Sequence, residues 1–390
     1  MHANVYYAVV FRLILLNFFF QIIIATISPY TQILLRNKGY SHSLVGLIVA
    51  IGQLGSIILP LIISGIADRT RKTKLIFFIL TIVCALAFFP AALSGSVVIT
   101  ALSLFVVSGM YLSTSPIIDG YQTRLLKGDA EKYGFARSAG TLSYVIALAL
   151  FSLTHFPNES DNMSISMCLV IFSAIFLLVV LIIPNDLPPE KNKEKRKYIS
   201  GVFSNRFYVM MIIVGLTRMA HSVADRLLSS YLVEDLGLGG NFALFISLGA
   251  LAEFVMMIVG GVLLKKKKTT PYTLIVISCI ALIVRLLIYR LFPNIPGLVC
   301  AQLLHAMTFG GFHIAVTQFI SHDVKKEHYS LAMSFYWAIA SNLPGMLGAL
   351  LGGFVIDSLG FKSMFLLYTL FPLAAVFLAF YCRDMLRNKA

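Results

Sequence analysis

The chain has 390 residues, of which 58% are hydrophobic and only 12% are charged. Soluble domains are roughly 45–50% apolar and about 25% charged, so this composition excludes an ordinary soluble protein and indicates a chain embedded in a bilayer. One spanning helix uses about 20 apolar residues, so the length suffices for about twelve helices and leaves no room for a soluble catalytic domain. The formal net charge of +14 alone is compatible with nucleic acid or an anionic surface as a partner.

Apolar segments follow one another along the whole chain, six before and six after a charged stretch at residues 185–205. The first segment has no small-residue cleavage site, so we expect it to be the first span and not a removable signal. The predicted spans are 5–29, 42–64, 75–93, 97–119, 137–155, 164–184, 207–231, 242–264, 271–291, 296–320, 330–356 and 363–382.

The positions of the basic residues predict the orientation of these spans. With a cytoplasmic N-terminus, 22 of the 31 Lys and Arg residues lie in inside segments and 4 in outside segments. The positive-inside rule predicts this asymmetry. We therefore expect both termini in the cytoplasm, and we interpret the basic excess as a topology signal that argues against nucleic acid as a partner.

The two halves of the chain are similar to each other. Residues 46–54 match residues 243–251 at an offset of 197, which is close to half the chain length. This match predicts a duplicated unit in an all-α membrane protein, with six-helix bundles at 1–184 and 206–390 and a cytoplasmic linker at 185–205. Parallel repeats around a midplane site are a transporter architecture.

Ionisable side chains within spans are costly and usually functional. Asp119 and Arg137 each lie nine residues from Gly128, at the predicted turn between spans four and five. In an antiparallel hairpin they reach equal depth, so we expect an ion pair between them. The alternative is two residues that extend separately to the membrane surface.

A second group lies in spans eight to ten. Arg285 and His305 lie ten residues either side of Ile295 and therefore share a depth, and Glu253 lies near the centre of span eight. An unpaired carboxylate there would take up a proton, whereas pairing with Arg285 would keep it ionised. Such a group is suited to proton coupling, with Asp225 as the second candidate carrier. A static network that only fixes helix packing is the alternative.

Further polar residues are secondary candidates for lining a cavity. Arg218, His221 and Asp225 are three and four residues apart and share a helix face. Asn17 and Gln21 are four apart, and hydrogen bonding between helices explains them equally well. The secondary candidates are Asn17, Gln21, Arg218, His221 and His313.

Features of an enzyme are missing from the sequence. It contains no nucleophile motif, metal-ligand cluster or phosphate loop, and its five cysteines have no paired spacing. Gly345, Gly348 and Gly352 of span eleven indicate close helix contact more than ligand binding. We therefore expect no enzymatic activity, no cofactor and no metal site.

One loop carries a family resemblance. The segment Gly65-Ile66-Ala67-Asp68-Arg69-Thr70-Arg71-Lys72 resembles the signature loop of the major facilitator superfamily, Gly-x-x-x-Asp-Arg-x-Gly-Arg-Lys, with one residue missing before Arg71. The resemblance implies the major facilitator fold and a conformational latch. A plain basic turn is the alternative, although topology does not require Asp68. The implied latch residues are Gly65, Asp68, Arg69, Arg71 and Lys72.

The charged residues within the spans resemble those of the lactose permease branch and, more closely, of its phenylpropionate-permease-like relatives. Thr308 stands where the lactose permease has a proton-carrying glutamate, so the sugar assignment and the proton carrier stay open. The resemblance implies a substrate site of Asp119, Arg137, Tyr144, Glu253 and His305, and a coupling set of Glu253, Arg285, His305 and Asp225.

Together these features predict proton-coupled uptake of a small polar organic solute by alternating access. The solute could be a sugar, a nucleoside or an aromatic carboxylate. We expect the solute, protons and the bilayer as partners, a functional monomer, and a multi-pass location in a plasma membrane such as a bacterial inner membrane. The alternatives are proton-antiport efflux and a solute receptor that does not transport. The missing soluble output domain argues against the receptor.

Overall fold

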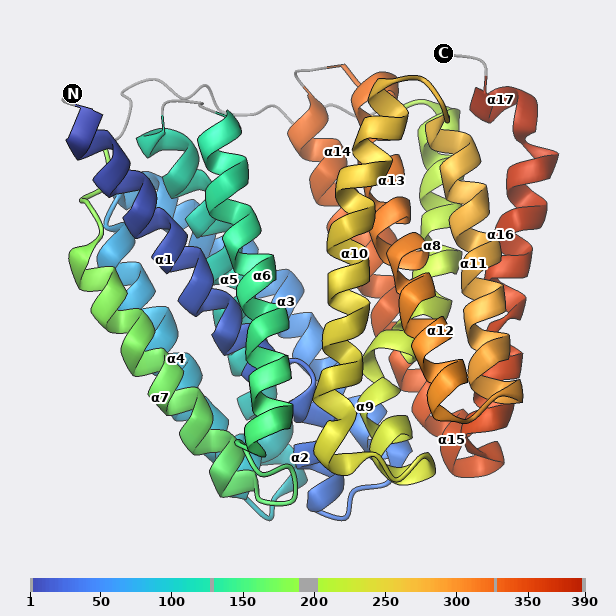
Figure 1. Cartoon of the computed structure of the whole chain (residues 1–390), viewed down its shortest axis with the longest axis horizontal. Helices are drawn as coiled ribbons and strands as arrows, with labels where there is room; N and C mark the ends of the chain where they lie inside the picture. The colour runs from blue at the N-terminus through green and yellow to red at the C-terminus, as the bar shows by residue number, and fades with distance from the viewer. Residues whose placement is uncertain (1–2, 127–129, 189–202, 326–327, 388–390) are drawn as a thin grey trace. The chain divides into compact units, whose positions relative to one another are not determined.

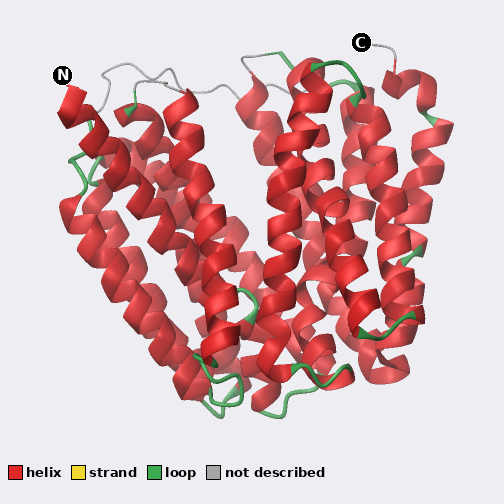
Figure 2. Ribbon diagram, viewed as in Figure 1, coloured by secondary structure: helices red, strands yellow, loops and turns green. Residues whose placement is uncertain are grey.

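The computed structural model describes residues 3–126, 130–188, 203–325 and 328–387. Within these ranges the chain is helical and contains no strand (Figure 2). Helices are expected because a segment in lipid must satisfy its own backbone N–H and C=O groups. Most of the predicted linker at 185–205 lies outside the described residues.

Eleven segments of the described chain are long and apolar enough to cross a membrane. The last of them, Leu331–Tyr381, has 51 residues and would measure about 75 Å as one helix, against a hydrocarbon core of about 30 Å. Gly360 interrupts it with a φ of 75° and a ψ of 170°. This segment therefore holds two spans, and the total agrees with the twelve predicted.

The chain divides into two compact units. The first contains the described parts of residues 1–40 and 48–195, and the second contains those of residues 41–47 and 196–390. The helices of the first unit, blue to green in Figure 1, are α1 (Ala3–Ile27), α2 (Tyr30–Asn37), most of α3 (His42–Thr70), α4 (Thr73–Leu93), α5 (Val97–Leu125), α6 (Ala130–Thr154) and α7 (Asn162–Ile182).

The second unit is interrupted more often by short and non-α helical turns. Its π-helical segments are Tyr231–Asp235, Ala306–Gly311 and Tyr336–Asn342, and Gly239–Asn241 forms a 3₁₀ turn. Its α-helices are α8 (Asn205–Arg226), α9 (Leu228–Ser230), α10 (Phe242–Lys265), α11 (Pro271–Leu291), α12 (Ile295–His305), α13 (Phe312–Asp323), α14 (Tyr329–Phe335), α15 (Leu343–Tyr368), α16 (Leu370–Tyr381) and α17 (Arg383–Arg387).

Two helices extend beyond the spans that hydropathy predicts. α3 continues to Thr70 and α5 to Leu125, whereas the predicted spans end at 64 and 119. Apolar composition indicates which residues are buried in lipid, but helical hydrogen bonding continues past that boundary. As a result Asp68 lies on the last turn of α3 and not in a loop, and the turn itself begins at Arg71, whose φ is 55°.

The start of α3 belongs to the second unit. Asp357 of α15 accepts hydrogen bonds from the backbone N–H groups of His42 at 2.9 Å and Ser43 at 2.7 Å. Free N–H groups at a helix start need such acceptors. Gly46 then passes so close to α15 that a Cβ atom there would lie 2.8 Å from the carbonyl oxygen of Ala349.

Glycines of the matching segments pack in corresponding places within each unit. A Cβ atom on Gly52 of α3 would lie 3.0 Å from Oγ of Ser108 in α5, and one on Gly249 of α10 would lie 2.4 Å from Oε1 of Gln302 in α12. The second span contacts the fourth, and the eighth contacts the tenth. This correspondence supports the duplication that the offset of 197 indicates.

Candidate functional site

The first unit contains a charged pair between α5 and α6. Nε of Arg137 lies 3.6 Å from Oδ1 of Asp119, and the Tyr133 hydroxyl is hydrogen-bonded to Asp119. The side chains of Arg137 and Asp119 are 37% and 36% exposed, so the pair is accessible and not sealed in the core. The ion pair that equal depth predicts is present, and its role stays a prediction.

Other predicted residues of the first unit differ in what they contact. Tyr144 is half-buried and lies seven residues after Arg137, about two turns along the same face of α6. Asn17 is buried, and its amide donates to the Leu13 carbonyl of its own helix at 2.8 Å. The Cγ atom of Gln21 lies 2.9 Å from the Cβ position of Gly140. Asn17 and Gln21 therefore take part in local structure and the packing of α1 on α6.

A chain of three side chains joins α10, α11 and α12 in the second unit. Nη1 of Arg285, a residue only 1% exposed, lies 2.9 Å from Nδ1 of His305. Nε2 of His305 lies 3.4 Å from Oε2 of Glu253. An arginine N–H can only donate, so Nδ1 of His305 accepts and the ring proton is on Nε2, facing Glu253. Glu253 is thus linked to Arg285 through the histidine. The structure shows no direct Glu253–Arg285 ion pair among the described residues.

A second chain lies beside the first. Nη2 of Arg218 donates to the Tyr336 hydroxyl at 3.0 Å, and Nδ1 of His313 lies 3.0 Å from the same oxygen. The Tyr336 hydroxyl therefore joins Arg218 and His313. The guanidinium of Arg218 lies 4.6 Å from the centre of the Phe309 ring. That ring also stacks with His305 at 5.7 Å and His313 at 6.2 Å, so it connects the two chains.

Two π-helical segments present this cluster. Ala306–Gly311 carries Thr308 and Phe309, and Tyr336–Asn342 begins with Tyr336 and Trp337. π-turns inside α-helices are frequent at functional sites. At Gly310 a Cβ atom would lie 2.8 Å from the Glu253 carbonyl oxygen, so the first segment lies directly against α10.

Asp225, the second candidate proton carrier, differs from its neighbours on α8. Its side chain is exposed, whereas Arg218 and His221 are 6% and 3% exposed. The spacing of three and four places these residues on one face of α8. Along that face, the side chains are buried at Arg218 and His221 and exposed at Asp225, near the end of the helix. Asp225 therefore lies outside the buried cluster.

The predicted latch residues lie near a charge network within the first unit. Oδ1 of Asp68 lies 3.4 Å from Nη1 of Arg124 and 3.9 Å from Nη1 of Arg71. Arg124 also donates through Nε to Asp186 at 3.0 Å, and Thr73 donates to Asp186 at 2.5 Å. Of the other predicted latch residues, Gly65 is half-buried and Arg69 and Lys72 are exposed.

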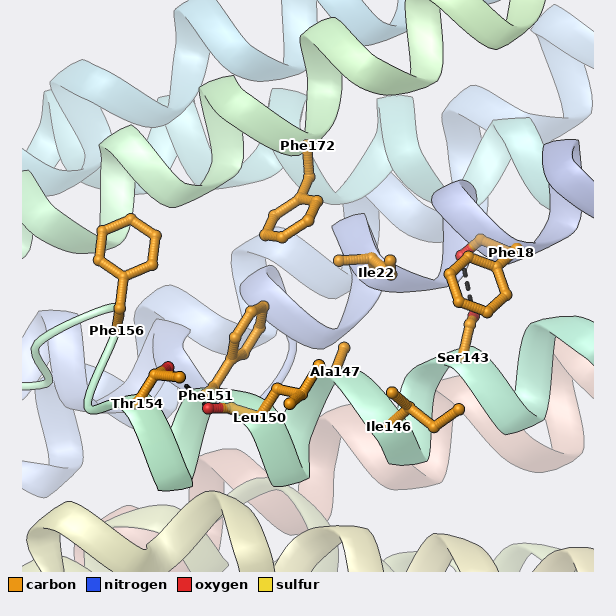
Figure 3. A pocket seen from close by; sticks show the side chains of 10 residues that line it. All are labelled: Phe18, Ile22, Ser143, Ile146, Ala147, Leu150, Phe151, Thr154, Phe156 and Phe172. Carbon is orange, nitrogen blue, oxygen red and sulfur yellow. Dashed lines mark hydrogen bonds between the residues drawn. The ribbon is translucent and has the colours of Figure 1, made fainter.

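An apolar cavity of about 210 Å³ lies between α1, α6 and α7 (Figure 3). Its hydroxyl groups are used within the protein, because Ser143 donates to the Phe18 carbonyl at 2.8 Å and Thr154 to the Leu150 carbonyl at 2.7 Å. The rest of the lining is aromatic and aliphatic. This cavity offers no free polar group to a polar solute, so we exclude it from the candidate site.

Sequence reasoning missed several residues of these networks. Tyr133 contacts the predicted Asp119, and Arg124 links the predicted Asp68 to Asp186. Tyr336 and Trp337 complete the second cluster. Trp337 is the single tryptophan of the chain, so the composition alone could have singled it out as a candidate. Tyr336 carries no such signal, because tyrosines are common in this sequence and only the tertiary structure shows that this one contacts Arg218.

Two units of membrane-spanning helices with charged side chains paired within the spans are typical of a multi-pass membrane transporter. Residues 10–367 match the MFS_1 like family. The chain therefore belongs to this family of major facilitator transporters, and it is not an enzyme.

Curated relatives support this assignment along almost the full chain. The chain is 21% identical over 371 residues to the uncharacterized transporter YwbF of Bacillus subtilis, covering 94% of this chain and 90% of the relative. It is 24% identical over 364 residues to the probable 3-phenylpropionic acid transporter of Escherichia coli, covering 90% and 92%.

Solved structures show the same fold. A crystal structure of the nucleoside transporter NupG, in its D323A mutant, matches with a TM-score of 0.81 at 17% identity, covering 96% of this chain and 99% of that chain. A D-xylose-proton symporter matches with a TM-score of 0.70 at 14% identity, covering 95% and 97%. These matches confirm the predicted fold class.

Proposed function

We propose that this transporter takes up a small polar organic solute together with protons by alternating access. The observation that carries the proposal is the Glu253–His305–Arg285 chain, in which a carboxylate within a span faces a histidine N–H at 3.4 Å. Ionisable residues in a span that contact one another are typical of proton relays. The names of the relatives, a nucleoside transporter, a probable phenylpropionic acid transporter and a xylose-proton symporter, fit the class of solute.

Glu253 is the proposed proton carrier. As a carboxylate it attracts the Nε2–H group of His305, which holds the histidine between Glu253 and Arg285. A proton on Glu253 removes that negative charge and weakens its attraction for both partners. The protonated and ionised proteins then favour different conformations. A proton shifts the balance between two conformations only when its affinity differs between them.

Asp119, Arg137 and Tyr144 are the proposed solute-binding residues of the first unit. Asp119 and Arg137 present one acceptor and one donor group on accessible side chains, and Tyr144 lies on the same helix face as Arg137. The proposed solute-binding residues of the second unit are Glu253 and His305. The proposed latch consists of Asp68 and its neighbours Gly65, Arg69, Arg71 and Lys72, and it would stabilise one of the two conformations.

The proposed setting is a bacterial inner membrane, with both termini cytoplasmic and the monomer as functional unit. The excess of Lys and Arg in segments on one side of the predicted topology supports the orientation. The relatives from Bacillus subtilis and Escherichia coli support a bacterial setting.

Glu253→Gln tests proton coupling. Proteoliposomes with an inward proton gradient are supplied with radiolabelled uridine, D-xylose or 3-phenylpropionate, and external pH is recorded. We expect the parent to accumulate at least one of these solutes while the medium becomes alkaline. The variant has no titratable group at this position, so it should still exchange solute but reach only the equilibrium level.

The matched control is Glu159→Gln, which makes the same chemical change in the loop between α6 and α7 and should accumulate solute like the parent. Uphill uptake by Glu253→Gln at the parental level would show that Glu253 is not the carrier. Solute export driven by proton entry would replace the uptake proposal with antiport.

A further inference from the structure

Arg218 carries a buried positive charge with no acidic partner. Its side chain is 6% exposed, and no Asp or Glu forms an ion pair with it among the residues that the structure describes. The Tyr336 hydroxyl and the faces of Phe309 and Phe312, at 4.6 and 5.6 Å, are its neighbours. Aromatic faces stabilise a cation only in part, and a buried charge usually has an oppositely charged partner. An anion beside Arg218 would therefore be stabilised by this buried charge.

Two nitrogen atoms on the same face of α8 point to where that anion belongs. Nε of Arg218 is buried without a hydrogen-bond partner, and so is Nε2 of His221, one turn further along the helix. The His221 ring lies 5.5 Å from both the His305 and the Phe309 rings. Buried polar atoms are normally hydrogen-bonded, a carboxylate has two oxygen atoms that match a guanidinium edge, and the tautomer of His221 with its proton on Nε2 would donate to the same group.

The balance of donors and acceptors favours an anion over a neutral sugar. The buried cluster contains two guanidinium groups, Arg218 and Arg285, and three imidazoles. Against these stands one carboxylate, Glu253, which already faces His305. The guanidinium groups only donate and are always charged, so the cluster carries a net positive charge that an anion balances and a neutral polyol does not.

An aromatic surface adjoins the unpaired donors. The Trp337 indole is 40% exposed, and its ring centre lies 5.0 Å from that of Tyr336 and 5.3 Å from that of His313. Tyr336 is the residue that holds Arg218. A solute held at Arg218 thus has an accessible flat apolar ring beside it, and offset ring stacking suits an aromatic solute.

We propose that Arg218 and His221 bind the carboxylate of a small aromatic acid, whose ring packs against Trp337. The inference rests on the proposed function and names its class of solute. The Glu253–His305–Arg285 chain handles the proton and contributes to solute binding, and the Arg218–Tyr336–His313 chain positions the carboxylate of the solute.

The test compares acids with uncharged analogues of the same ring. Binding of benzoate, 3-phenylpropionate, benzamide and 3-phenylpropanamide is measured on the full-length protein in lipid nanodiscs. We expect the parent to bind each acid about ten- to a hundredfold more tightly than its amide, because hydrogen bonds to charged groups are that strong. Arg218→Gln should remove this preference and change amide affinity by less than about threefold.

Two further variants keep the test decisive. Arg218→Lys retains the buried charge but loses the planar guanidinium and its paired N–H donors, so it should weaken acid binding about tenfold. This variant keeps the test possible if Arg218→Gln does not fold. Arg290→Gln removes the same charge from the end of α11, where the side chain bonds to the Lys362 carbonyl, and should bind acids like the parent.

Equal binding of acids and amides by the parent, or parental acid binding by both Arg218 variants, would overturn the inference. Parent proteoliposomes that transport uridine or D-xylose without binding either acid would overturn the inference alone. Parent proteoliposomes that move none of the solutes would contradict the proposed function itself.

Discussion

Asp186 lies just beyond α7 and joins three segments of the first unit. Its carboxylate accepts hydrogen bonds from Nε of Arg124 at 3.0 Å, from Thr73 at 2.5 Å and from the backbone N–H of Leu187 at 2.8 Å. Burial by itself raises the pKa of Asp186, but the hydrogen bonds from Arg124 and Thr73 outweigh it and hold this pKa below the ordinary value of 3.8.

Asp186→Asn should therefore destabilise the protein in a pH-dependent way. A lowered folded-state pKa means that ionised Asp186 stabilises the fold above the ordinary value, and that this stabilisation is lost as the pH falls through the folded-state pKa. At pH 7 we expect a loss of about 1–3 kcal/mol in the free energy of unfolding. Thermal midpoints at neutral and acid pH measure it, with the exposed Asp384→Asn as control. A deficit of equal size at both pH values would contradict the role assigned to Asp186.

At the scale of elements, small residues decide how closely helices approach. A Cβ atom on Gly348 of α15 would lie 2.2 Å from Oγ of Ser222 and 2.3 Å from the Met219 carbonyl oxygen, both in α8. Gly352 is likewise close to Val223 and Leu227, at 2.8 Å. The predicted glycine contact is confirmed at these two positions. It is wrong for Gly345, where a Cβ would meet no atom within 4 Å.

These glycines provide a matched pair of substitutions. Gly348→Ala forces α8 and α15 apart, since a carbonyl oxygen cannot move aside like a side chain, and should cost about 1–3 kcal/mol of stability. Gly345→Ala adds the same methyl group to open space in the same helix and should be neutral or stabilise by up to about 1 kcal/mol. Thermal unfolding in detergent compares them. If both variants melt at the same temperature, the close approach at Gly348 is not limiting.

At the scale of the whole molecule, the orientation in the membrane follows from charge. The end of α10 and the loop after it contain four consecutive lysines, Lys265 to Lys268, whereas the loop between α4 and α5 contains none. The positive-inside rule places the lysine loop in the cytoplasm. An odd number of spans separates the two loops, so they lie on opposite sides.

Single cysteines at these loops test the orientation. In a background with the five native cysteines replaced by serine, Gly95→Cys should react with a membrane-impermeant maleimide added to intact cells. Lys267→Cys should react only after the membrane is permeabilised. The reverse pattern would invert the proposed topology, and labelling of both in intact cells would refute the predicted span count between them.

The sequence by itself determined the class of protein, the spans and the depth of the charged residues. These are one-dimensional properties, because hydropathy marks lipid burial and equal distance from a turn means equal depth in adjoining helices. Asp119 with Arg137, and Arg285 with His305, were predictable for this reason, and the structure brings each pair together.

Only the tertiary structure decided which residues of equal depth meet and at what angle. Rotation about a helix axis is set by packing, and that rotation put His305 between Glu253 and Arg285 and left Asp225 exposed. The π-helical turns add a residue to a helix turn and redirect the side chains after it. Hydropathy encodes neither that change nor the contact of Tyr336 with Arg218.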